Sequence, residues 1–86
     1  MERIFFDYSK LSGRIKEKFG SQKVFSDALG ISETALSNKM NGIYYFTQAE
    51  IEKSIALLGL EQGSVTDYFF TRKVEKTVHN LAKLRV

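Results

Sequence analysis

Four short polar side chains lie close together between residues 33 and 38, and their types are those that can recognise nucleic-acid bases. They are Glu33, Thr34, Ser37 and Asn38, and we expect them on the outward side of a short helix. Amide, hydroxyl and carboxylate groups can form hydrogen bonds with base edges when such a helix lies in the major groove of DNA. The residues therefore indicate a base-reading helix face, although short polar residues also occupy ordinary solvated faces.

The other chemistry-bearing residues show no pattern of a catalytic or metal site. The chain has no cysteine and a single histidine, His79, so disulfides and thiolate-bound metals are excluded. No other metal-ligating residue stands at a suitable spacing from His79 in the sequence. His79 is therefore interpreted as a surface residue. No Ser/His/Asp set and no glycine-rich phosphate loop occurs. The sequence therefore predicts a binding protein with no catalytic residue, metal or cofactor, and not an enzyme.

Two short helices joined by a tight turn, over residues 22–42, are predicted to position the polar face. Gly30 can adopt the positive φ that a steep helix crossing requires, and Ile31 can fill the space between the helices. Ser26 is small where the helices approach each other, and Ser32 can cap the second helix, Glu33–Met40. A shared apolar seam is expected from Phe25, Leu29, Ile31 and Leu36.

A further helix is predicted before this segment. Its apolar face has a 3-4-4 spacing and consists of Tyr8, Leu11, Ile15 and Phe19. Asp7 or Ser9 can cap its start, and Gly13 inside it is interpreted as the mark of a close helix contact. Residues 3–6 have the composition of a strand.

Two more helices are predicted after the segment. Thr47 and Glu50 have the spacing of a capping box, and the helix that they begin carries an apolar stripe of Ile51, Ile55 and Leu58. Ser64 is the predicted cap of a last short helix. Residues 71–86 are basic, and Val74, Val78 and Leu81 in them have helical spacing, so a docked helix, a strand and a disordered tail all stay open.

Residues 22–42 resemble the helix-turn-helix of the lambda-repressor-like (Cro/CI, Xre) family. The resemblance rests on Gln22, Gly30, Ser32 and the pair Asn41-Gly42. The wider pattern, in residues 6–11, 18–22 and 67–70, is similar to a small phage-encoded regulator family of unknown function from phages of Gram-positive bacteria. The resemblance covers about residues 6–75. It implies a compact, all-α, five-helix DNA-binding domain over residues 1–70, followed by a basic extension at 71–86.

The resemblance also implies roles for single residues. Glu33, Thr34 and Asn38 match positions that face bases. Phosphate contacts are implied for Gln22, Lys39, Asn41 and the loop with Tyr44 and Tyr45. Two residues depart from the family's pattern, because Glu33 would repel nearby phosphates and Lys39 stands where an apolar residue is common.

The charge distribution limits what the predicted helix pair can do alone. The net charge is +3, divided into +2 for residues 1–20, 0 for 21–42, −3 for 43–70 and +4 for 71–86. A neutral motif with few phosphate contacts binds DNA weakly at physiological salt. Lambda-like proteins add a second subunit, and the predicted dimer surface is Tyr68, Phe69 and Phe70.

Two hypotheses follow. The first is a Cro-like or repressor-like transcription regulator of a phage or prophage, which binds a double-stranded DNA operator as a homodimer with helix 33–40 in the major groove. The second is a modulator or antirepressor that keeps this fold and binds a phage repressor, because an acidic surface could occupy the repressor's basic face. Either protein is expected in the cytoplasm of the bacterial host cell and away from membranes, since the longest apolar runs are too short to span a bilayer.

Overall fold

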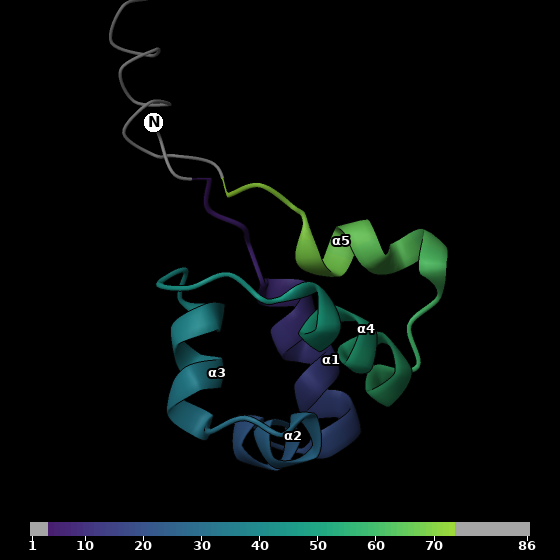
Figure 1. Ribbon diagram of the computed structural model, residues 1–86. Helices are drawn as coiled ribbons and strands as arrows, with labels where there is room; N and C mark the ends of the chain where they lie inside the picture. The colour runs from purple at the N-terminus through teal and green to yellow at the C-terminus, as the bar shows by residue number, and fades with distance from the viewer. Residues whose placement is uncertain (1–3, 74–86) are drawn as a thin grey trace, which may run out of the picture.

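The computed structural model describes residues 4–73 and consists of five α-helices and one short 3₁₀ turn. The helices are α1 (Ser9–Phe19), α2 (Gln22–Leu29), α3 (Glu33–Met40), α4 (Gln48–Leu58) and α5 (Val65–Phe69), and the turn η1 is Gln62–Ser64. Figure 1 shows α1 and α4 in the middle of the molecule, with α2 at one end and α5 at the other. The predicted all-α, five-helix fold is confirmed.

Side-chain caps explain where three of the helices begin. The Ser21 hydroxyl accepts a hydrogen bond from Val24 N–H, and the Ser32 hydroxyl accepts one from Ala35 N–H. Both groups of the predicted capping box at α4 are in place, because Thr47 and Glu50 each accept from the other's backbone amide. These bonds satisfy amides that have no partner inside a helix.

The predicted Asp7 cap of α1 is present one position before the N-cap, whereas the predicted Ser64 cap of α5 is wrong. The N-cap of α1 is Tyr8, whose side chain makes no cap bond. Asp7, one position earlier, accepts from both the amide and the hydroxyl of Ser9. Ser64 does not cap α5 either, because its hydroxyl donates to the carbonyl of Glu61 within the preceding turn.

The turn between α2 and α3 is formed as predicted. Gly30 has a φ of 88°, in the left-handed region, and Ile31 N–H donates to the Ser26 carbonyl over 3.1 Å. Such a bond closes a helix end around a residue with positive φ. Ser26 is fully buried, and its hydroxyl donates to the Lys23 carbonyl, so this small residue lets the helices approach without leaving a buried polar group unpaired.

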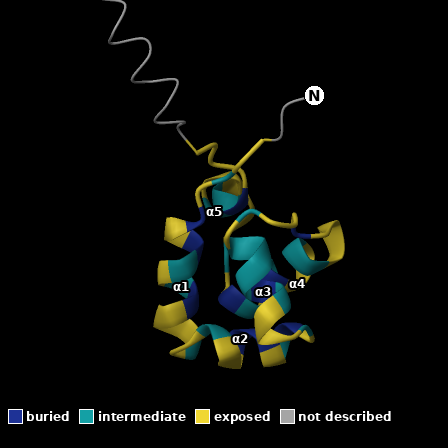
Figure 2. Ribbon diagram, turned by 90° about the vertical axis from the view of Figure 1, so that its left-hand side faces the viewer, coloured by how far each residue is buried: buried dark blue, intermediate teal, exposed yellow. Residues whose placement is uncertain are grey.

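The core lies between the helices, and Figure 2 shows that each helix turns its buried residues inward. Its fully buried large side chains come from all five helices: Leu11 and Ile15 of α1, Phe25 of α2, Leu36 of α3, Leu58 of α4 and Phe69 of α5. Leu29 is also buried, and Ile31 packs partly buried against this cluster, which confirms the predicted seam. Gly13, by contrast, faces open space, since a Cβ added there would meet no atom within 4 Å, and the predicted helix contact is absent.

The two ends of the described chain pair with each other. Asp7 N–H donates to the Thr71 carbonyl over 2.7 Å, and Lys73 N–H donates to the Phe5 carbonyl over 2.8 Å. Phe6 and Arg72 form an antiparallel bridge between these bonds. The predicted extended segment 3–6 therefore exists in its described part as an isolated bridge and not as a strand of a sheet. Val74, Val78, His79 and Leu81 lie outside the described residues.

Candidate functional site

Helix α3 presents part of its predicted polar face to solvent. Glu33 and Thr34 are exposed, whereas Ser37 and Asn38 are half-buried. The Asn41 amide donates to the Ser37 hydroxyl over 3.3 Å, and the Asn38 carbonyl accepts from Ile43 N–H over 2.9 Å. The four residues therefore lie on one helix, and the two in its first turn are the most accessible to solvent.

The side chain of Lys39 is largely covered by its neighbours. Its side chain is 13% exposed, and its ammonium group lies 3.0 Å from a carboxylate oxygen of Glu50, whose side chain is 17% exposed. The same ammonium donates to the Tyr45 carbonyl over 3.2 Å. Lys39 thus joins the end of α3 to the start of α4, and a phosphate could reach it only after this pair opens.

The environment of Glu50 favours its charged form. Partial burial alone would raise its pKa, but the hydrogen bond from Thr47 N–H and the Lys39 ammonium outweigh that effect, and the pKa lies below its ordinary value of 4.5. The Glu50 carboxylate is therefore charged at neutral pH, and it pairs with Lys39, the cation that the predicted reading helix itself carries.

The other predicted phosphate-contacting residues occupy different surroundings. Gln22 is half-buried and lines a shallow groove together with Asn41. Tyr44 is 61% exposed. The Tyr45 hydroxyl donates to the Ile4 carbonyl over 2.6 Å, so this hydroxyl is already engaged, and its ring turns toward a neighbouring cavity.

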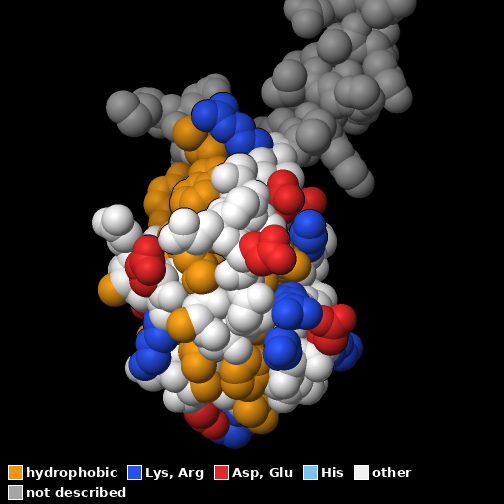
Figure 3. All heavy atoms as spheres, turned by 90° about the vertical axis from the view of Figure 1, so that its right-hand side faces the viewer, with side chains coloured by type: hydrophobic (Ala, Val, Ile, Leu, Met, Phe, Trp, Pro, Cys, Tyr) orange, Lys and Arg blue, Asp and Glu red, His pale blue; other side chains and the backbone are white. Residues whose placement is uncertain are grey.

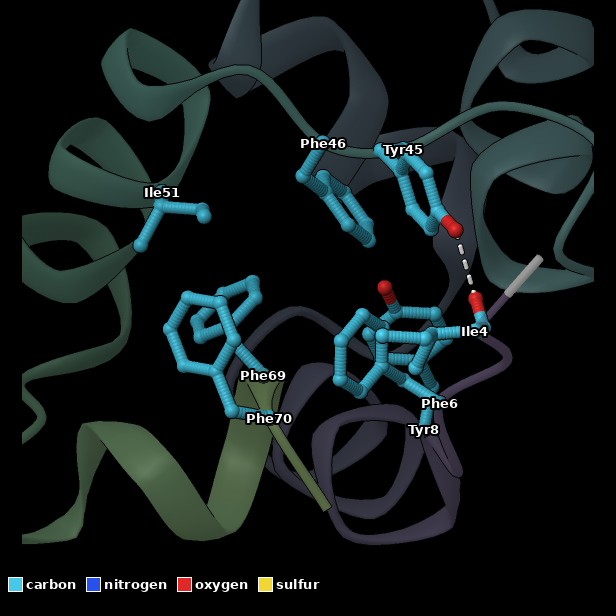
Figure 4. Close-up of a pocket in the computed structure, with 8 residues that line it drawn as sticks. All are labelled: Ile4, Phe6, Tyr8, Tyr45, Phe46, Ile51, Phe69 and Phe70. Carbon is cyan, nitrogen blue, oxygen red and sulfur yellow. Dashed lines mark hydrogen bonds between the residues drawn. The ribbon is translucent and has the colours of Figure 1, made fainter. Parts of the chain in front are cut away.

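That cavity is an apolar pocket of about 280 Å³, which sequence reasoning missed. We call it the aromatic pocket; it is lined by Ile4, Phe6, Tyr8, Tyr45, Phe46, Ile51, Phe69 and Phe70. Figure 4 shows these side chains converging from the N-terminal segment, the α3–α4 connection, α4 and the end of α5. Because three of its walls are far apart in sequence, only the fold brings them together.

Edge-to-face ring contacts hold the pocket's walls. The centroids of Tyr8 and Phe46 are 5.3 Å apart, those of Phe46 and Phe69 are 5.5 Å apart, and those of Phe6 and Phe70 are 5.8 Å apart. These distances are favourable for aromatic pairs. The signal in the sequence was the set of adjacent aromatic residues at 5–6, 44–46 and 68–70, although nothing local showed that they meet.

The rim of the aromatic pocket is exposed. Ile4, Tyr45 and Phe70 line it and are 41%, 47% and 46% exposed. Phe5 is also exposed and packs against Gly42, where an added Cβ would lie 3.0 Å from its ring. Figure 3 shows hydrophobic side chains gathered toward the upper left of one face of the molecule. Contiguous exposed apolar surface of this kind marks interaction sites.

The three residues of the predicted dimer surface differ in how far they are buried. Phe69 is 2% exposed and belongs to the core, so it is not available to a partner. Tyr68 is half-buried, with the Lys10 ammonium 5.0 Å from its ring centroid. Phe70 alone of the three is exposed, and it belongs to the rim of the aromatic pocket.

Residues 4–73 contain no cluster of histidine, aspartate and glutamate suited to hold a metal ion. Nor does any helix in that part of the chain have the length and apolar character needed to cross a membrane.

Comparison with known proteins places the chain in a family. The family described as "Protein of unknown function (DUF739)" matches residues 4–72. The chain belongs to this family. The prediction of a phage-type family of unknown function is thereby supported, whereas the finer helix-turn-helix assignment stays a prediction. No curated protein matches the chain.

A solved structure resembles this DUF739 chain over most of its length. It is the solution structure of the modulator of repression (MOR) of the temperate bacteriophage TP901-1 from Lactococcus lactis. The two chains are 40% identical, and the match covers 81% of this chain and 95% of the modulator with a TM-score of 0.69.

Proposed function

We propose that this chain is a modulator of repression of a phage, and that it acts by binding a phage repressor protein. The observation that carries the proposal is the 40% identity to a phage modulator of repression over 95% of that protein's length. It favours the second of our two hypotheses over an autonomous DNA-binding regulator. The function is binding without catalysis, and the expected place is the cytoplasm of the bacterial host, where a repressor meets its operator.

The electrostatics of α3 support a protein partner. Glu33 is exposed at the start of the helix, and Lys39 is paired with Glu50. The affinity of proteins for DNA comes largely from cations placed against phosphates. Residues 21–42 carry no net charge, and the pairing of Lys39 removes one of their two cations from this role.

The aromatic pocket is the proposed docking surface. Protein interfaces are enriched in tyrosine and phenylalanine at their centres, where a few buried side chains supply most of the binding energy. Tyr45 and Phe70 stand exposed at the rim, and the cavity of about 280 Å³ has room for an apolar side chain of the partner.

Charge complementarity would orient the partner. Residues 43–70, which supply most of the pocket's walls, carry one basic and four acidic side chains, a net charge of −3. A repressor's DNA-binding face must be basic, so the two surfaces attract each other and associate faster at low salt. Occupation of that basic face would keep the repressor from DNA.

The test is a titration of the companion repressor with the purified chain, followed by calorimetry, with Phe70→Ser as the disruptive variant. Val24→Ser is the matched control, because Val24 is 48% exposed against 46% for Phe70 but lies on α2, away from the pocket. We expect Phe70→Ser to weaken the complex about tenfold or more, as a hot-spot residue does, and Val24→Ser to leave it unchanged. Absence of a complex at micromolar concentration would refute the proposal.

Operator binding by α3 is the second candidate, favoured by the accessible first turn of the helix. In this function the chain is a lambda-repressor-like helix-turn-helix protein that binds DNA as a homodimer, with Glu33, Thr34, Ser37 and Asn38 facing bases. A gel-shift titration with DNA from the neighbouring intergenic region tests it. The candidate fails if no site shifts, or if Thr34→Ala and Asn38→Ala bind DNA as the natural chain does.

A further inference from the structure

We infer that the aromatic pocket binds a tyrosine side chain of the protein partner, and that the Tyr8 hydroxyl donates a hydrogen bond to that phenol. The binding of a phenol stands on the geometry of this chain, whereas its origin in a repressor rests on the proposed function. Tyr8 is then the residue that gives the docking surface its specificity.

The Tyr8 hydroxyl is a polar group without a partner in an otherwise apolar pocket. Tyr8 is 8% exposed, and its hydroxyl makes no hydrogen bond within residues 4–73. Figure 4 shows its oxygen directed into the space that the pocket residues surround, whereas the Tyr45 hydroxyl donates to the Ile4 carbonyl. Because an unpaired hydroxyl in apolar surroundings costs free energy, a ligand that accepts from it is bound more tightly.

The same hydroxyl can be reached from the pocket. Among the described residues, no side-chain nitrogen or oxygen is both fully enclosed and without a hydrogen-bond partner. Since the Tyr8 oxygen has no partner there, it keeps some surface open to a water-sized molecule. Burial raises the pKa of Tyr8 above its ordinary value of 10.0, so the hydroxyl holds its proton at neutral pH and is available as a donor.

The walls of the pocket favour a neutral ring as the occupant. The Phe46 ring is 5.3 Å from that of Tyr8 and 5.5 Å from that of Phe69, and both pairs meet edge to face. A further ring can pack against these walls in the same manner, within a volume of about 280 Å³. All the lining residues are uncharged, so a charged occupant loses its hydration without gaining a counter-ion.

Among neutral side chains, that of tyrosine meets these conditions best. Phenylalanine has no acceptor for the Tyr8 hydrogen, and the indole of tryptophan has only a donor. Methionine offers a weak sulfur acceptor, and threonine has no ring to pack against the walls. A phenol combines a ring with an oxygen that both accepts and donates.

The charge around the pocket indicates where this tyrosine lies on the partner. Residues 43–70 carry a net charge of −3, and Glu52 is exposed next to the pocket-lining Ile51. Such a surface attracts a basic one. The tyrosine therefore lies on or beside the basic DNA-binding face of the repressor.

Two small molecules separate the phenol from the bare ring. p-Cresol has the structure of the tyrosine side chain and toluene that of phenylalanine. NMR titration of the full chain follows the Ile51 methyls and the Phe70 ring, with the Val24 methyls on α2 as reference. We expect p-cresol to bind the natural chain at least as tightly as toluene, although its hydroxyl must leave water. In Tyr8→Phe the ratio of the two affinities should shift toward toluene by about fivefold, the effect of one net hydrogen bond.

Tyr45→Phe is the matched control, because the Tyr45 hydroxyl belongs to the same pocket but is already engaged with the Ile4 carbonyl. We expect this variant to keep the ratio of the natural chain. Clearly tighter binding of toluene by the natural chain overturns the phenol site. So does a ratio that is unchanged in Tyr8→Phe or changed equally in both variants, and so do shifts at Val24 as large as those at Ile51.

A double-variant titration tests the source of the phenol. Each tyrosine of the companion repressor is replaced by phenylalanine in turn, and each complex is measured with the natural chain and with Tyr8→Phe. We expect one replacement to weaken the complex with the natural chain about fivefold and to have no further effect with Tyr8→Phe, because the two hydroxyls form one bond. If the complex forms and no replacement is coupled to Tyr8, a repressor tyrosine is not the occupant. If no complex forms, the proposed function is refuted and the p-cresol result still stands.

Discussion

Replacement of Glu50 by alanine tests how α3 is fastened to α4. The Glu50 carboxylate accepts from Thr47 N–H over 2.8 Å and lies 3.0 Å from the Lys39 ammonium. Alanine removes both interactions but little buried apolar surface. The ammonium of Lys39, on a side chain that is 13% exposed, then keeps the Tyr45 carbonyl as its hydrogen-bond acceptor within residues 4–73.

The expected cost is the sum of two effects. Loss of half of a capping box costs about 0.5–1 kcal/mol. Leaving a mostly buried cation without its counter-ion costs about 1–3 kcal/mol, below the cost for a fully buried pair because some water reaches the group. We therefore expect Glu50→Ala to lower the free energy of unfolding by about 1.5–4 kcal/mol, which lowers Tm by about 6–30 °C in a domain of this size.

Urea denaturation followed by circular dichroism measures this loss at pH 7, with Glu52→Ala as control because Glu52 lies on the same helix and is exposed. Lys39→Met supplies the informative comparison. It replaces the cation with an apolar side chain of similar length, while Glu50 keeps its bond to the Thr47 amide. The Glu50 carboxylate, on a side chain that is 17% exposed, then loses its counter-ion, so we expect a cost of about 1–3 kcal/mol, lower than that of Glu50→Ala because the capping bond is kept. The reasoning is refuted if Glu50→Ala costs no more than Glu52→Ala, or if Lys39→Met costs more than Glu50→Ala.

The same pair gives a pH dependence whose sign follows from the lowered pKa of Glu50. A carboxylate with a lowered folded-state pKa contributes stability that is fully present above its unfolded pKa, ordinarily 4.5, and that is lost as pH falls through the folded value. The stability difference between the natural chain and Glu50→Gln should therefore be greatest at neutral pH and shrink in acid. A difference that stays constant across this range would contradict the charged pair.

The remaining predictions concern the fold. Gly30→Ala should destabilise the protein by about 1–2 kcal/mol, because φ is 88° there, whereas Gly13→Ala should stabilise it by about 0.5–1 kcal/mol, because an added Cβ inside α1 meets open space. Opposite signs in thermal melts confirm the pair, and equal signs contradict it. Leu36→Ala should cost about 3–5 kcal/mol, since Leu36 is completely buried. A loss below about 1 kcal/mol in urea titration would show that α3 packs less tightly than the structure indicates.

Local chemistry explains why the starts of α3 and α4 and the turn between α2 and α3 were predictable. Helix caps and turn glycines act over three or four residues, as Ser32, Thr47 and Gly30 do here. Their effect can therefore be recognised from the neighbouring residues in the sequence. The departures are of the same local kind, because Asp7 satisfies the α1 start from one position before the N-cap and the Ser64 hydroxyl donates backward to the Glu61 carbonyl.

The sequence by itself determined the helices, their order and the polar residues of α3, because each depends on spacing along the chain. Only the tertiary structure decided which side chains are available to a binding partner. It paired Lys39 with Glu50, buried Phe69, and brought Phe6, Tyr45 and Phe70 around one pocket. Contacts between residues tens of positions apart depend on how the helices pack, and no local pattern records that arrangement.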